Sequence, residues 1–255
     1  MPIGLSAPPA SRRPVVTALV VVLLVGVFVR TLLLRSPPPA LFCTDLEESA
    51  AALRASADTV QGFVCRWGAI PDELREGRDL FTLLTSVFVH TSWLHLLVNV
   101  AFLVAFAPRV EEDLGHVGLL AVALGSAVLA GAVHVLLAPF VTDPGIGASG
   151  AVAGVLGAHL VLAPRAEVRV LVGPVPVRLP TWFVIGTWAV LQGVYTVLAL
   201  RRAEPGGAVS YDVHAVGFAV GLVTVLVLLR LRPDLRRWRP QPVVAERSAA
   251  GSPER

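Results

Sequence analysis

The sequence contains no lysine, one methionine, two tyrosines and two cysteines among its 255 residues. Only 15% of the residues are charged, 55% are hydrophobic, and the mean hydropathy is +0.73. A soluble domain of this size cannot bury so much apolar surface, so the composition indicates a chain that folds in a lipid bilayer. Arginine alone gives the net charge of +3, and no basic stripe with stacking aromatics is present, which argues against nucleic-acid binding. Two cysteines are too few for a metal cluster or a disulfide scaffold.

Apolar segments recur along the chain. The first covers residues 15–34, and the proline-rich stretch behind it offers no cleavage site, which favours a retained span over a signal peptide. The others cover residues 93–107, 117–140, 149–163, 181–200 and 213–231. Several approach the ~20 residues that a membrane span requires. We therefore expect an all-α membrane protein, a bundle of six transmembrane helices.

The placement of arginines predicts how the chain is divided and oriented. Cytoplasmic segments are expected to be rich in arginine, and this favours a cytosolic N-terminus at residues 1–14 and a disordered cytosolic tail at residues 233–255. Between them we expect the first transmembrane helix at residues 15–34, a long outer loop at residues 35–78, and a core with five further transmembrane helices at residues 79–232.

Four polar side chains fall near the outer ends of the predicted spans, at similar depth: His95, Asn99, Ser149 and His214. Polar groups within spans are costly and are functional candidates for that reason. His95 and Asn99 are four residues apart and share one helix face. Their alternative role is to hydrogen-bond a neighbouring helix.

Ser149 lies among glycines at the predicted start of a span, where free N–H groups and the positive end of the helix dipole favour a developing oxyanion. The alternative is a packing helix whose serine is only a cap. Two small-residue faces, one with Gly150 and one with Gly217 and Gly221, predict close approach of this helix to the one that carries His214. Close approach would let Ser149 reach His214 as its general base.

The remaining polar residues are expected to be structural. Asp212 is two residues from His214 and should point elsewhere on a helix, which predicts a serine–histidine dyad without an acid. Neither a metal nor a cofactor is expected, because His116, His134 and His159 have no partners at metal-ligand spacing.

Together these motifs resemble a bacterial rhomboid intramembrane protease over residues 67–231. The resemblance rests on His90, His95 and Asn99 in one segment, on Glu111 four residues before a glycine, on Gly147-Ala-Ser149-Gly150, and on His214 with Gly217 and Gly221.

The resemblance implies a rhomboid catalytic core at residues 79–232, with Ser149 as nucleophile, His214 as base, and His95, Asn99 and the Ser149 N–H as oxyanion donors. His90, Gly147, Gly150, Gly217, Gly221 and Glu111 would support the site. It also implies an active site that faces outside and cleaves transmembrane segments of other proteins. Ala153 stands where some members stack an aromatic ring on the base, so His214 must be oriented otherwise.

Two further expectations follow. Cys43 and Cys65 both fall in the outer loop, an oxidising setting where a disulfide can persist, although two unpaired thiols are the alternative. The rival function is a non-proteolytic rhomboid-like protein that binds membrane clients. Such relatives lack the serine or the histidine, whereas this chain has both.

Overall fold

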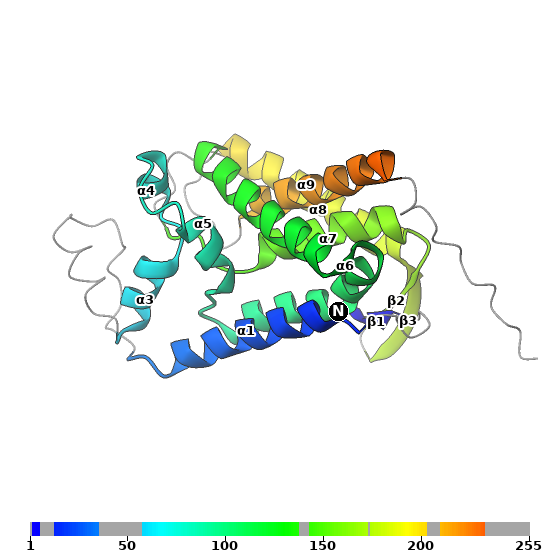
Figure 1. Cartoon of the computed structure of the whole chain (residues 1–255), viewed down its shortest axis with the longest axis horizontal. Coiled ribbons are helices and arrows are strands. Elements are labelled where there is room, and N and C mark those ends of the chain that lie inside the picture. The colour runs from blue at the N-terminus through cyan, green and yellow to red at the C-terminus, as the bar shows by residue number, and fades with distance from the viewer. Residues whose placement is uncertain are drawn as a thin grey trace, which may run out of the picture.

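The computed structural model describes residues 2–5, 13–35, 58–137, 143–172, 174–202 and 210–232. These residues are mostly helical, as the hydropathy pattern predicts (Figure 1). The helices are α1 (Val15–Leu32), α3 (Val60–Trp67), α4 (Pro71–Arg75), α5 (Thr82–Thr85), the 3-10 turn η1 (Ser86–Phe88), α6 (Trp93–Leu137), α7 (Ser149–Leu162), α8 (Thr181–Arg202) and α9 (Tyr211–Leu231). The strands are β1 (Pro2–Leu5), β2 (Glu167–Val172) and β3 (Val175–Pro180).

Four of the described helices, α1, α6, α8 and α9, are long and apolar enough to cross a membrane, and α7 is a shorter apolar helix. Their outward faces carry large aliphatic side chains, such as Val22, which is 68% exposed, and Val190, which is 66% exposed. A soluble protein would not leave so much apolar surface on several helices uncovered. These faces are suited to lipid.

The long helix α6 is bent at Gly115, whose φ of 76° and ψ of 175° are not helical. A positive φ of this kind favours glycine. The residues between the predicted spans at 93–107 and 117–140 are therefore helical except at Gly115. Just before the bend, the buried carboxylate of Glu111 accepts hydrogen bonds from the Val16 N–H at 2.7 Å and the Thr17 N–H at 2.9 Å. Glu111 thus satisfies free N–H groups at the start of α1 and ties that helix to α6.

The expectation of an all-α chain was too narrow, because the described residues include a three-stranded antiparallel sheet in the order β1-β2-β3. In β2, Val168 and Val170 face the protein while Glu167 and Arg169 are exposed. This alternation is the pattern of a half-buried strand. The hairpin of β2 and β3 connects the end of α7 to the start of α8, and β1 comes from the N-terminal segment before α1.

Helix α7 is the centre of the bundle. Nearly all of its residues are buried, from Gly150 to His159 without interruption. The short helices α3, α4 and α5 gather at one end of the molecule and the sheet lies at the opposite end (Figure 1). The start of α7 faces the end with the short helices, because Gly145 pairs with Ala69 and the Gly147 N–H donates to the Ser86 carbonyl at 2.9 Å.

Candidate functional site

Ser149 is the first residue of α7. The residue before it, Ala148, is the N-cap, and no side chain caps the helix. Ser149 is therefore not a capping serine, which was the alternative role for it. The first N–H groups of a helix have no intrahelical acceptor, so this end of α7 offers donors next to the Ser149 hydroxyl.

Glycines bring α7 and α9 into backbone contact just after Ser149 and His214. A Cβ added at Gly217 would lie 2.5 Å from the Gly150 carbonyl oxygen, and one at Gly221 would lie 2.0 Å from the Gly154 carbonyl oxygen. No side chain fits such distances, so only glycine permits this approach. The predicted close packing of these two helices is confirmed, and it brings the turns that start at Ser149 and His214 together.

His214 is surrounded by residues of α8 and α9 that the sequence analysis did not single out. Its Nδ1 lies 2.8 Å from Oε1 of Gln192, the Trp188 ring centroid lies 6.0 Å from its own, and that of Tyr211 lies 6.5 Å away. These three neighbours lie next to the imidazole, whereas Ala153 offers it no aromatic ring. Gln192 could have been found from the sequence, because it is a polar side chain within a predicted span.

His95 projects from α6 toward the residues that precede Ser149. A Cβ at Gly147 would lie 2.4 Å from Cε1 and 2.7 Å from Nε2 of the His95 ring. Gly147 also has a φ of +107°, a conformation that favours glycine. Both features make Gly147 a position where a side chain would displace His95 or distort the turn into α7.

His90 and Asn99 form a buried network beside His95. The Asn99 amide nitrogen lies 3.0 Å from the His95 carbonyl oxygen and 3.2 Å from His90 Nε2. The Ala148 N–H also donates to His90 Nε2, at 3.4 Å, while His90 Nδ1 lies 3.3 Å from the Phe88 carbonyl. This pattern fits a neutral imidazole with its proton on Nδ1.

Burial, with a smaller contribution from neighbouring His95, lowers the pKa of His90 to about 4. His90 is therefore uncharged near neutral pH and can accept both hydrogen bonds. The structure shows Asn99 bridging His90 and His95, which is a supporting position. Its expected role as an oxyanion donor stays a prediction.

We expect a disulfide between Cys43 and Cys65, and Cys43 lies outside the described residues. Cys65 is buried in α3, with 2% of its surface exposed, and is not a free thiol. The pairing stays a prediction.

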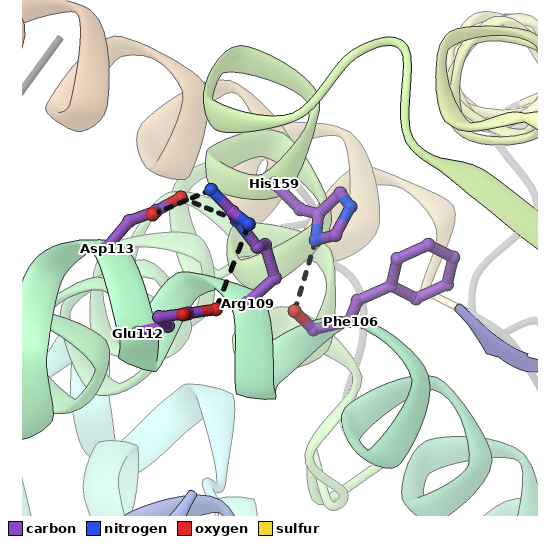
Figure 2. A network of polar contacts seen from close by, with 5 residues as sticks. All are labelled: Phe106, Arg109, Glu112, Asp113 and His159. Atoms are coloured by element: carbon purple, nitrogen blue, oxygen red, sulfur yellow. Dashed lines mark hydrogen bonds and ion pairs between the residues drawn. The ribbon is translucent and has the colours of Figure 1, made fainter. Parts of the chain in front are cut away.

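The other histidines have structural partners. His134 Nδ1 lies 2.5 Å from Oδ2 of Asp212, so this acid points to α6 and not to His214. At the sheet end, His159 Nδ1 lies 3.1 Å from the Phe106 carbonyl, beside the ion pair of Arg109 and Asp113 (Figure 2). His116 lies 2.7 Å from the Glu111 carboxylate.

The sequence is similar to two known proteins. The chain is 29% identical over 147 residues to "Rhomboid protein 1, mitochondrial" of Saccharomyces cerevisiae. The aligned residues make up 56% of the chain and 40% of that protein. It is 33% identical over 86 residues to "Putative rhomboid protease YdcA" of Bacillus subtilis. Here the aligned residues make up 32% of the chain and 41% of that protein. The chain thus spans about two fifths of the length of these curated relatives.

The family model of the rhomboid domain matches residues 77–231, which include every helix from α5 to α9. The matched part contains the start of α7, the glycine contacts between α7 and α9, and the network around His90. Because this match covers well over half of the sequence, the chain belongs to the rhomboid family.

Proposed function

We propose that this chain is an intramembrane serine endopeptidase that cleaves transmembrane segments of other proteins with a dyad of Ser149 and His214. The observation that carries the proposal is the glycine-mediated contact between α7 and α9, in which the carbonyl oxygen of Gly150, one residue after Ser149, meets Gly217, three residues after His214. Family membership and the name of the Bacillus relative, a putative rhomboid protease, support it.

The proposed reaction begins when His214 Nε2 takes the proton of the Ser149 hydroxyl and the Ser149 Oγ attacks the peptide carbonyl. The tetrahedral intermediate collapses to an acyl-enzyme as His214 returns the proton to the leaving amine. A water molecule, activated by the same histidine, then hydrolyses the ester and releases the second product.

The oxyanion of the intermediate would form at the start of α7. There the free N–H groups of the first turn and the positive end of the helix dipole favour negative charge. The His95 ring lies against Gly147, next to this position. The Asn99 amide donates a hydrogen bond to the His95 carbonyl oxygen. Each well-placed donor of this kind contributes about 3 kcal/mol in hydrolases that use an oxyanion hole.

The proposed arrangement in the bilayer has six spans, obtained by dividing α6 at Gly115 and counting α7 as a span. Both termini would be cytoplasmic and the site would open to the outside, as the arginine distribution favours. The 14 residues of α7 have a length of about 21 Å, which is less than the ~30 Å of a hydrocarbon core. Ser149 would thus lie below the membrane surface, at the depth of a substrate span.

Reconstitution of the purified full chain into liposomes with a fluorogenic transmembrane substrate tests the proposal. The expected result is cleavage by the wild type and its loss in Ser149→Ala. A matched control is Ser126→Ala, because Ser126 is a buried serine of α6 that packs on Gly154 of α7, the helix that carries Ser149. Ser126→Ala should cleave normally.

Two results would overturn the proposal. The first is cleavage that persists in Ser149→Ala. The second is a folded wild type that binds transmembrane clients but never cleaves them, which would indicate a client-binding protein.

A further inference from the structure

Helix α8 contacts α9 through one of its faces. Trp188, Gln192 and Tyr195 are spaced four and three residues apart, so they lie on the same side of α8. Trp188 packs near His214 and against Phe218, and Tyr195 stacks on Tyr211 with ring centroids 4.9 Å apart. Other faces of α8 expose large apolar side chains. The face that carries Gln192 is the one directed at the base.

The contact between Gln192 and His214 has a defined chemical consequence. Oε1 of Gln192 lies 2.8 Å from Nδ1 of His214. A carbonyl oxygen only accepts hydrogen bonds, so the proton of a neutral His214 must be on Nδ1. The lone pair is then on Nε2, the nitrogen that a general base presents to a serine hydroxyl.

The acidic side chain nearest to His214 in the sequence does not face its Nδ1. Asp212, two residues earlier, pairs with His134 of α6, and both side chains are only 13% exposed. Tyr211 and Trp188 contribute rings beside the imidazole. Gln192 is therefore the group that faces Nδ1, where many serine hydrolases place a carboxylate.

We propose that Gln192 is the positioning residue of the base and holds His214 in the tautomer with a free Nε2. This inference rests on the proposed function, since the tautomer matters for catalysis only if His214 acts on Ser149. It gives α8 a direct part in catalysis, because a displacement of this helix would break the hydrogen bond that prepares the base.

Two substitutions test this role in the reconstituted full chain. Gln192→Met keeps the length of the side chain but removes the acceptor, and we expect kcat to fall by about 10- to 100-fold with KM little changed. This loss is smaller than the roughly 10²- to 10⁴-fold contribution of general acid–base catalysis, because the base itself remains. Gln192→Glu keeps an acceptor and adds a charge that favours the protonated imidazole. It should retain more activity than Gln192→Met, and the acidic limb of its pH–rate profile should move to higher pH.

A control and a second readout separate this role from a merely structural one. Val190→Met alters an exposed position of α8 and should leave both kcat and the pH profile unchanged. Nitrogen-15 NMR of histidine-labelled Ser149→Ala protein reads the tautomer without any need for activity, with the His214 signal identified by its loss in a His214→Asn variant. We expect a protonated Nδ1 with Gln192 present and a mixture of tautomers in Gln192→Met.

The outcomes distinguish the two proposals. A wild type that does not cleave, together with the expected tautomer, would overturn the proposed function and leave the hydrogen bond intact. A protonated Nε2 with Gln192 present, or a Gln192→Met variant whose kcat stays within twofold of the wild type, would overturn the role of Gln192.

Discussion

Helix α9 is held by its two neighbours in different ways. Against α7 it packs backbone to backbone, with Gly157, Gly217 and Gly221 at distances that admit no Cβ. Against α8 it packs through side chains, and Gly186 and Gly193 of α8 have no atom within 4 Å of an added Cβ. The two helices that carry the proposed nucleophile and base thus form the closely packed pair, while the helix that orients the base is attached more loosely.

This difference indicates how precision and movement are divided in the molecule. Backbone contacts between glycines leave no freedom for rotamer changes, so the distance between the start of α7 and the start of α9 is well fixed. Contacts through Trp188, Gln192 and Tyr195 can be broken by side-chain rotation or by a shift of α8. A substrate that displaces α8 would alter the orientation of His214 before it alters the packing of α7 on α9.

The largest effect is expected from Gly221→Ala, which disrupts the close packing of α9 on α7. The added methyl would lie 2.0 Å from the Gly154 carbonyl oxygen. Overpacking of this kind costs about 1–3 kcal/mol or more, so the melting temperature in detergent and the cleavage rate should both fall sharply. Gly193→Ala is the matched control on α8, where the space is open. It should be neutral or stabilise by about 0.5–1 kcal/mol. Equal effects of the two substitutions would show that α9 is packed no more closely against α7 than against α8.

Gly147→Ala is expected to reduce activity more than stability. The alanine would have to adopt a φ of +107° and its methyl would lie 2.4 Å from the His95 ring. Strain of this kind costs about 1–3 kcal/mol, and His95 would be displaced from the place where we propose that it donates to the oxyanion. Gly145→Ala, whose added Cβ meets only an ordinary contact at 3.6 Å, is the control. Cleavage assays and thermal melts of both variants would reveal whether His95 must lie against a glycine.

Asp212→Ala tests a third attachment of α9, the hydrogen bond between Asp212 and His134 of α6. Loss of a hydrogen bond to a charged group costs about 1–3 kcal/mol, so thermal stability should decrease moderately. Activity should remain within about threefold of the wild type, because Asp212 faces away from His214. A double-mutant cycle with His134→Ala should reveal coupling between the two residues. A fall in kcat of a hundredfold or more would instead identify Asp212 as the acid of a triad.

The smallest effect is expected from Tyr195→Leu, which weakens the side-chain contact between α8 and α9. The substitution removes the stacking of Tyr195 on Tyr211, whose rings lie 4.9 Å apart. An aromatic pair of this kind contributes about 0.5–1.5 kcal/mol. Thermal melts should register that loss, and kcat should change far less than in Gln192→Met. A larger loss than in Gly221→Ala would show that α8 is the main support of α9.

Much of the fold was predictable because lipid imposes long apolar runs that are visible in the sequence. The starts of α7 at Ser149 and of α8 at Thr181 coincide with the predicted segments. The sheet was missed because β2 is short and alternates over residues 167–170, with Val168 and Val170 facing inward and Glu167 and Arg169 exposed. A search for long apolar runs does not register such a period-two pattern.

The candidate site was predictable where a residue type is unusual for its surroundings. Ser149, His95 and His214 are polar groups in apolar segments, and all three lie at the end of the bundle where α7 begins. That this end faces outside stays a prediction. The hydrogen bond from His214 to Gln192 was not predicted, because it depends on how α8 is rotated against α9. Sequence spacing within one helix defines a shared face, but it does not determine which residue of another helix that face meets.

The most direct test of the central claim is to locate the covalent adduct of a serine-reactive fluorophosphonate by mass spectrometry of the reconstituted full chain. We expect one modified residue, Ser149, with labelling that is lost in His214→Asn and retained in Ser126→Ala. Modification of a different serine, or undiminished labelling of Ser149 in His214→Asn, would show that Ser149 and His214 do not form a dyad.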